Sequence, residues 1–352
     1  MARMSEERHF REIDAPVYRE ELEPWLPPRI FDAHVHLVRR SDFLPGIDPR
    51  KLKTTAPEPT AIDFTPRRLA DTMGRLFPKQ RWEAFVFHAP YTVVDIERAN
   101  RWIASLGRRH AHLHPLMIVR PEMQAKELDA AVEAGGFVGF KPYLSFARPV
   151  ASSGCPHRGE TRIGDFLTRD HLEVAVARGL AIILHIPRKQ RAADPVNIRD
   201  VARLCERYPK AKLVIAHCGR SYSPYYIEQA IGTWRDFPNL SFDVSAVDNA
   251  ETIEAVLENV PPTRLLYGSD LPITLLRGRH LCVNRHCFFL TETPCPNSVS
   301  PPRGAEFPMT FMLYETVRAV LRAVRKQKLP SAAIEDIFYG NAARLVGLEH
   351  RQ

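Results

Sequence analysis

Two histidines lie one residue apart in the stretch FDAHVHL, residues 31–37. The stretch reads as a buried strand, and side chains two positions apart on a strand point to the same side. His34 and His36 therefore project together, about 7 Å apart along the strand. Two imidazoles on one wall provide half of a metal site. A pair of core histidines is the alternative, and the HLH pair at residues 112–114 has the same spacing with nothing to support a metal role.

Further ligand types end three other apolar runs. They are His185 in AIILHIP (181–187), His217 in KLVIAHCG (212–219) and Asp270 in RLLYGSDLP (264–272). If these runs are strands of a barrel, their carboxyl ends meet at one mouth. Imidazoles and a carboxylate around a common point suit Zn, Mn or Fe, with a position left open for water. The pattern predicts a divalent metal site.

Eight apolar runs rich in Val, Ile, Leu and Phe alternate with segments of helical periodicity. The runs cover residues 29–37, 83–90, 112–119, 136–143, 181–187, 212–219, 239–246 and 264–272. Helices are predicted over residues 65–77, 168–178, 196–207, 224–236 and 309–327. Strands that are apolar on both faces, each followed by a helix, predict an α/β fold, the (β/α)8 TIM barrel. An open doubly wound sheet is the alternative.

Three proline-containing segments lie outside this alternation. Residues 1–28 are an N-terminal extension to a barrel domain at 29–348, and long loops follow the first strand (38–64) and the eighth strand (273–307). Long loops in a compact domain are often lids or binding loops. We expect the second loop to cover the mouth as a partly buried cap.

Aromatic and basic side chains near the expected mouth are candidates for substrate contact. They are Tyr143, Tyr222, Tyr267, Phe288, Phe289, Arg120, Arg188 and Arg220. An arginine at these positions could hold a carboxylate, and a solvated arginine is the alternative for each. Asp243 and Ser245 in the seventh run are candidates to orient a ligand imidazole, with barrel packing as the alternative.

Charge and composition restrict the function classes. The net charge is +8, but Lys and Arg are scattered in ones and twos, which argues against nucleic-acid binding and fits a solvated surface or an anionic small-molecule substrate. No apolar run approaches the ~18 residues of a membrane span. The start, MARMSEERHFREID, lacks the apolar core of a secretory signal, so we expect a cytoplasmic protein. The six cysteines form no CxxC pair and are predicted to be reduced thiols.

Six segments together resemble the amidohydrolase superfamily, and within it the amidohydrolase-related branch of hydrolases and metal-dependent decarboxylases. They are FDAHVHL, IILHI, YPKAKLVIAHCG, FPNLSFDVS, LLYGSDLP and FYGNAARLVGL, in this order over residues 29 to 348. The resemblance implies one or two divalent metal ions, with Zn favoured and Mn or Fe as alternatives. It implies metal ligation by His34, His36 and His185, with Asp270 as ligand and proton shuttle.

The resemblance leaves two roles open. His217 would be a ligand of a second metal or would hydrogen-bond the reactive water. Lys141, in GFKPY, stands where some family members carry a lysine carboxylated by carbon dioxide that bridges two metals. Burial would supply the neutral amine that this reaction needs. Alternatively, the Lys141 ammonium pairs with a substrate carboxylate or a nearby acid.

The expected activity is hydrolysis of an amide, ester or lactone of a small substrate, which could carry an acidic group. A metal lowers the pKa of a bound water toward ~7 and polarises a carbonyl, and Asp270 would act as general base and then general acid. Decarboxylation of a small carboxylic acid is the alternative, followed by iron-dependent oxygen chemistry and by a non-catalytic binding protein. The sequence does not determine the oligomeric state, and a homo-oligomer is one alternative.

Overall fold

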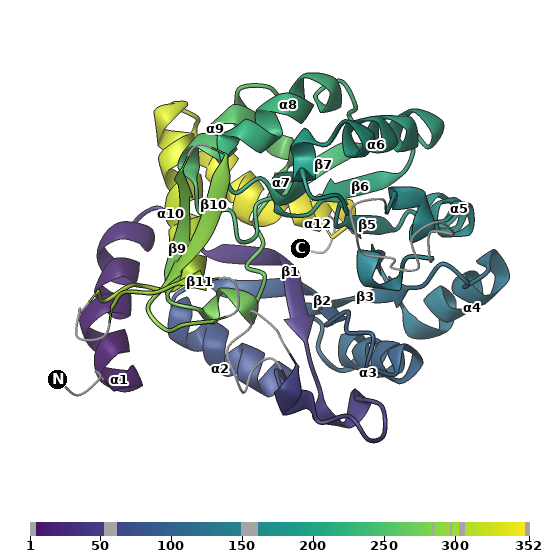
Figure 1. The fold of residues 1–352 in the computed structure, drawn as a ribbon, viewed down its shortest axis with the longest axis horizontal. Helices are drawn as coiled ribbons and strands as arrows, with labels where there is room; N and C mark the ends of the chain where they lie inside the picture. Colours follow the sequence, from purple (N-terminus) through teal and green to yellow (C-terminus); the bar gives the residue numbers. More distant parts are fainter. Residues whose placement is uncertain are drawn as a thin grey trace.

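Eight parallel strands form the centre of the molecule, in the order β1 to β8 along the chain (Figure 1). The computed structural model describes residues 5–52, 62–148, 161–283, 285–295, 298–302 and 307–348. The strands are β1 Arg29–Leu37, β2 Arg81–His88, β3 Leu113–Val119, β4 Gly139–Pro142, β5 Ala181–Leu184, β6 Lys212–Ile215, β7 Leu240–Asp243 and β8 Leu265–Leu266. Backbone hydrogen bonds join β1 to the segment after β8, from the Ala33 N–H to the Tyr267 carbonyl and from the His36 N–H to the Leu271 carbonyl. The predicted TIM barrel is confirmed.

Helices surround the barrel and connect its strands. The longer ones are α2 Pro66–Leu76, α3 Ile96–Arg109, α4 Ala125–Gly135, α5 Arg169–Arg178, α6 Pro195–Arg207, α8 Pro224–Trp234, α9 Ala250–Leu257 and α10 Met312–Lys326. The short ones are α1 Glu6–His9, α7 His217–Arg220, α11 Ser331–Glu335 and α12 Asn341–Leu345. Among the described residues, no helix is both long and apolar enough to cross a membrane.

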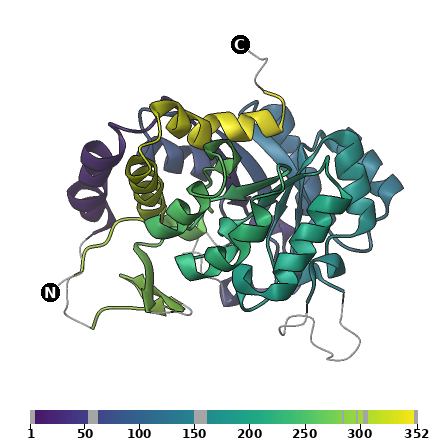
Figure 2. The same ribbon diagram turned by 90° about the horizontal axis from the view of Figure 1, so that it is seen from above.

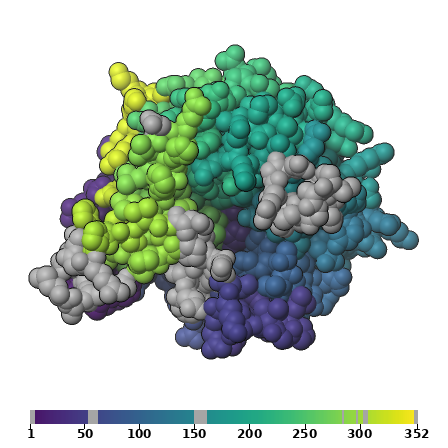
Figure 3. Space-filling view, in the orientation of Figure 1, coloured from purple at the N-terminus to yellow at the C-terminus, as the bar shows by residue number. Residues whose placement is uncertain are grey.

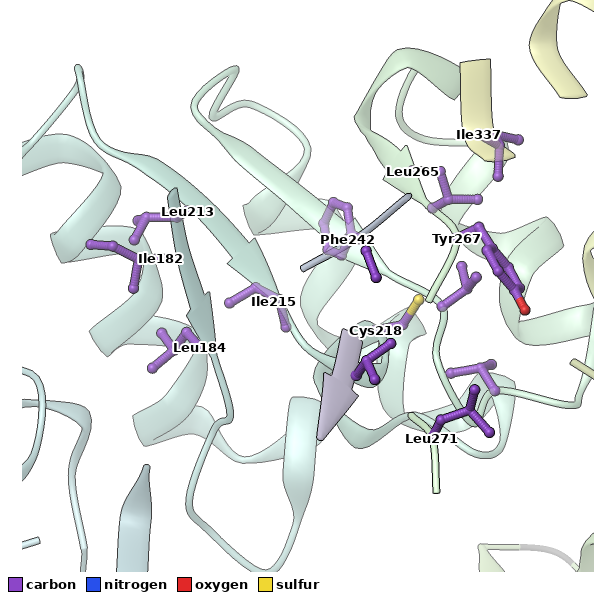
Figure 4. Close-up of a cluster of buried hydrophobic side chains, with 14 of the residues drawn as sticks. Ile182, Leu184, Leu213, Ile215, Cys218, Phe242, Leu265, Tyr267, Leu271 and Ile337 are labelled. Carbon is purple, nitrogen blue, oxygen red and sulfur yellow. The ribbon is translucent and has the colours of Figure 1, made fainter. Parts of the chain in front are cut away.

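The main core lies between the strands and the surrounding helices. Figure 4 shows side chains from four neighbouring strands in this layer, among them Leu184, Ile215, Phe242 and Leu265. A second cluster fills the inside of the barrel and includes Ala342 of α12. Figure 2 places the yellow C-terminal helices on the opposite side of the molecule from the yellow-green hairpin that follows β8. The C-terminal helices therefore close the amino end of the barrel and leave the carboxyl end for the site.

A bulge in β1 directs its histidines into the barrel. Phe31 and Ala33 belong to the inner cluster. The register of β1 against β2 then shifts between Asp32 and Val35, so the even-numbered residues point inward after the shift. The rings of His34 and His36 consequently lie 5.2 and 4.7 Å from the ring of Phe87 on β2, which is in the inner cluster.

The connection after β8 contains a small sheet of its own. Strands β9 Gly278–Val283 and β10 His286–Thr291 form an antiparallel hairpin, and β11 Ser298–Val299 pairs with β10. The expectation of reduced cysteines is wrong for one pair, because the hairpin register places Cys282 opposite Cys287 and the two form a disulfide. Cys205, Cys218 and Cys295 are free, and Cys155 lies outside the described residues.

Candidate metal centre

Four candidate ligands from three parts of the chain meet inside the carboxyl end of the barrel. The Asp270 Oδ1 atom lies 3.6 Å from His34 Nε2 and 3.4 Å from His36 Nε2. His34, His217 and Asp270 each offer a ligand atom, and these atoms lie within 4.8 Å of one another. All four side chains are buried. The arrangement has the size of a metal-binding cluster.

His185 adjoins this group from the loop after β5. Its ring centroid lies 5.5 Å from that of His217 and 4.9 Å from that of Tyr143. Burial lowers the pKa of His185 well below its usual value, and the nearby Arg220 lowers it further. His185 is therefore a neutral imidazole at neutral pH, the form that can bind a metal.

Two side chains from the end of β7 orient the histidines. The Nδ1 atom of His34 lies 2.5 Å from Asp243 Oδ2, so its Nε2 faces the cluster. His217 Nδ1 donates to the Ser245 carbonyl at 2.8 Å, which leaves its Nε2 free as a ligand atom. A carboxylate behind a ligand imidazole is the usual support of a metal-binding histidine. Gly268 permits this approach, because a Cβ there would lie 2.9 Å from Asp243 Oδ1 and 3.0 Å from His34 Cβ.

The backbone is strained where the site residues sit. Asp270 has a φ of 62° and His217 a φ of 54°, a region that residues other than glycine rarely adopt. Asp270 is held by a hydrogen bond from its N–H to the His34 carbonyl. Such strain is retained where the surrounding structure dictates it, and it concentrates at functional sites.

The ionised Asp270 carboxylate makes the cluster suited to bind a cation. Burial by itself raises the pKa of Asp270, but His217, His36 and His34 together hold it below its usual value, so the carboxylate is ionised. Burial also lowers the pKa of both β1 histidines. The buried atoms Asp270 Oδ1, His36 Nδ1 and His185 Nδ1 have no hydrogen-bond partner among the described residues. Buried imidazoles around an ionised carboxylate fit Zn, Mn or Fe.

Lys141 lies beside His34 at the end of β4. Its Nζ is 3.3 Å from His34 Nε2, and the side chain is completely buried. Burial lowers its pKa to about 8, against the opposing effect of Asp243 and Asp270. A neutral fraction of about a tenth is therefore present at pH 7, which is compatible with a carbamate bridge as well as with a cation that faces substrate.

Three further residues surround the approach to the cluster. Burial raises the pKa of Tyr143, and the nearby Asp270 raises it further. Burial also raises the pKa of Tyr222, with Arg220 lowering it and Asp270 raising it. Arg220 donates to the Pro187 and Arg188 carbonyls and pairs with no carboxylate among the described residues. Figure 3 shows a hollow on this face, between the yellow-green hairpin and the teal and blue parts of the barrel.

The other predicted contact residues have different surroundings. Arg120 lies 3.0 Å from Glu122, and Arg188 lies 3.0 Å from Asp194. Phe288 points outward from the hairpin and is 47% exposed, whereas the Phe289 ring packs on His280 at 4.2 Å.

Sequence reasoning missed two features near the site. The first is Asp32, which accepts hydrogen bonds from the Ser269 and His34 N–H groups. Its position two residues before His34 could have indicated that it lies near the site. The second feature is a contact between His280 of β9 and Asp248 of the loop after β7. No sequence signal joins these two residues, because hairpin docking brings them together.

Comparisons with known proteins place this geometry in context. A family model described as Amidohydrolase matches residues 31–348. No curated protein matches the sequence. A solved structure of a probable 2-pyrone-4,6-dicarboxylic acid hydrolase from Acinetobacter baumannii, with citric acid bound, is 15% identical with a TM-score of 0.55, over 90% of this chain and 99% of that chain.

Two solved decarboxylase structures are similar to the same extent. A dihydroxybenzoic acid decarboxylase from a Polaromonas species, with bound manganese and the inhibitor 2-nitroresorcinol, is 14% identical with a TM-score of 0.56, over 92% of this chain and 98% of that chain. A 5-carboxyvanillate decarboxylase from Sphingomonas paucimobilis is 15% identical with a TM-score of 0.53, over 91% and 99%. At these identities the likeness establishes the fold.

Proposed function

Because this chain belongs to the amidohydrolase family, we propose that it is a metal-dependent hydrolase of an amide, ester or lactone in a small, acidic molecule. The observation that carries the proposal is the Asp270 carboxylate. It is buried, its Oδ1 has no hydrogen-bond partner among the described residues, and it faces the Nε2 atoms of His34 and His36. An ionised, unpaired carboxylate between imidazoles is costly unless a cation neutralises it.

The residues that would hold the metal are His34, His36, His185 and Asp270. His217 would either bind a second ion or hydrogen-bond the reactive water. When bound, a divalent metal lowers the pKa of water and polarises a carbonyl. Lys141 would bridge two ions as a carbamate or, as an ammonium, would pair with an acidic group of the substrate.

Asp270 is the proposed proton carrier. Its lowered pKa keeps the carboxylate ionised, which is the form that can accept a proton from water. The same group then protonates the leaving group, as a general base that becomes a general acid. His217 is held by the Ser245 carbonyl at its Nδ1, which would leave its Nε2 for a second ion or for the reactive water.

Arg220 is the proposed partner of the substrate's acidic group. It stands near His185, Tyr143 and Tyr222, because its charge alters the pKa of all three side chains. No carboxylate among the described residues pairs with it, and a guanidinium binds a carboxylate strongly when water is excluded.

A substrate panel tests the proposal. The metal-loaded protein is assayed against lactones, amides and esters of small acids and against hydroxylated benzoic acids, with acid release and carbon dioxide release measured separately. Acid release supports the hydrolase. Carbon dioxide release without hydrolysis would assign the decarboxylase to the same site, and no turnover of any compound by fully loaded protein would contradict both.

A further inference from the structure

The hairpin of β9 and β10 docks on the barrel through one of its two faces. His280, Cys282 and Phe289 lie on the inner face, and the Cys282 sulfur contacts the Tyr222 carbonyl at 3.1 Å. At the hairpin turn, the Tyr226 hydroxyl donates to the Arg285 carbonyl at 2.6 Å. On the outer face Leu281 is 48% exposed. The inner face therefore rests on the segment that leads from Arg220 into α8.

His280 is held by hydrogen bonds on its backbone and its side chain and by contacts with two aromatic rings. Asp248 accepts hydrogen bonds from the His280 backbone N–H at 2.6 Å and from its Nδ1 at 3.1 Å. The imidazole stacks on the Tyr222 ring, with centroids 4.1 Å apart and planes 9° from parallel. The Phe289 ring lies 4.2 Å from it as well. Position, tautomer and ring plane of His280 are thus all determined.

The contacts of Tyr222 leave its hydroxyl end for a ligand. Besides the stacked His280, the Arg191 guanidinium lies over its ring at 4.9 Å. The hydroxyl itself has no hydrogen-bond partner among the described residues. The Tyr222 N–H donates to the Arg220 carbonyl at 3.2 Å, which keeps the two residues side by side, and Arg220 and Asp270 both alter the pKa of the phenol. A hydroxyl held beside an unpaired arginine can add a second hydrogen bond to any acid bound there.

We propose that Tyr222 is a specificity-determining residue, whose hydroxyl donates to the substrate's acidic group beside Arg220, and that His280 and Asp248 are positioning residues that hold the Tyr222 ring in place. The inference rests on the proposed function, since it assumes an acidic substrate at the metal site. It assigns the β9–β10 hairpin a role in substrate selection that the metal ligands do not have.

A double-mutant cycle tests this coupling. Tyr222→Phe removes the hydroxyl and keeps the stack, while His280→Phe keeps the stack and the backbone bond to Asp248 but removes the bond from the imidazole. KM and kcat are measured on the best acidic substrate of the panel and on its neutral methyl ester. Each single variant should raise KM for the acid about tenfold, the worth of a hydrogen bond to a charged group, with kcat within about threefold. KM for the ester should stay unchanged.

The double variant decides whether His280 acts through Tyr222. If it does, the double variant matches Tyr222→Phe; if the two act independently, the increases multiply to about 100-fold, and the positioning role is overturned. Leu281→Ser, on the outer face of the same strand, is the matched control and should behave as the parent. Should His280→Phe fail to fold, Asp248→Asn takes its place in the cycle.

The outcomes separate the two proposals. A parent protein that turns over no compound overturns the proposed function and the inference together. A parent that turns over an acidic substrate, with Tyr222→Phe leaving KM unchanged or lowering kcat alone, overturns only the inference.

Discussion

At the scale of single residues, the site depends on charge states that burial determines. Burial lowers the pKa of His34 and His185, while the pKa of Asp270 lies below its usual value, so its carboxylate is ionised. The sequence predicts that His34, His36, His185, His217 and Asp270 converge, because each stands at a strand end in a recognisable motif, and the structure brings them together. For Asp243, the sequence left two alternatives open, orientation of a ligand imidazole or packing in the barrel. The sequence could not decide between them, because the pairing of Asp243 with His34 depends on a contact between β1 and β7.

Replacing Asp270 tests its proposed role in proton transfer. Asp270→Asn retains an oxygen ligand but cannot carry a proton, so we expect the metal content to remain and turnover to fall by a factor of about 100 to 10,000. Metal per chain and kcat are measured on the same preparation. Asp129→Asn, which alters an exposed carboxylate paired with Arg178, is the control. Near-normal turnover in Asp270→Asn would remove this residue from the mechanism.

Replacing Asp243 tests the orientation of His34. In Asp243→Asn an amide N–H group would face His34 Nδ1 and favour the tautomer with a proton on Nε2, the atom that would bind the metal. We expect metal affinity to fall by a factor of about 10 to 100. The dissociation constant for Zn is measured by competition with a chelator, with the thermal unfolding midpoint as a check of folding. Unchanged affinity in a folded variant would contradict this role.

At the scale of elements, the strand pattern determines the barrel, and tertiary contacts determine its details. The eight apolar runs coincide with the eight strands because every barrel strand is buried on both faces. The β1 bulge could not be predicted, since FDAHVHL is buried throughout and its pattern shows no change of side. The β9–β10 hairpin and its disulfide were missed because residues 273–307 alternate too weakly to distinguish strands from loop.

A histidine at the start of α5 makes stability depend on pH. Neutral His171 accepts a hydrogen bond from the Thr168 N–H at Nδ1 and donates from Nε2 to the Arg120 carbonyl. Burial lowers its pKa from 6.5 to about 4. Between these values the unfolded chain binds the proton and the folded chain does not, so stability falls as the pH falls through this window.

The magnitude follows from the size of this pKa change. From pH 7 to pH 5, the parent should lose about 2 kcal/mol more of its free energy of unfolding than His171→Gln does. Urea unfolding of both proteins at the two pH values gives the difference. Parallel losses in parent and variant would show that His171 does not contribute to this dependence.

At the scale of the whole molecule, residues of the N-terminal extension bind the segment that leads into the β9–β10 hairpin. Arg277, just before β9, donates to the buried Asp14 at 3.1 Å and also to Glu6. Asp14 in turn accepts from the Thr310 hydroxyl, and His9 lies 2.9 Å from the Met309 carbonyl. The sequence predicts residues 1–28 as an extension to the barrel domain, but it could not predict these contacts, which join residues almost 300 positions apart.

Breaking this connection should destabilise the protein. Arg277→Met leaves the Asp14 carboxylate buried without its charged partner, so we expect the free energy of unfolding to fall by about 3 kcal/mol. Arg8→Met, which removes an exposed ion pair with Glu12, should change it by less than about 1 kcal/mol. Urea unfolding measures both variants. Equal, small effects would mean that the Asp14 pair does not hold the extension in place.

The most direct test of the central claim is the metal content of the protein. Elemental analysis for Zn, Mn and Fe per chain is performed on the parent, on His34→Ala/His36→Ala and on His112→Ala, which alters the second HxH pair. We predict one or two metal ions per chain in the parent and in His112→Ala, and loss of metal from the double variant. No metal in the parent after loading, or equal metal in all three proteins, would contradict the account.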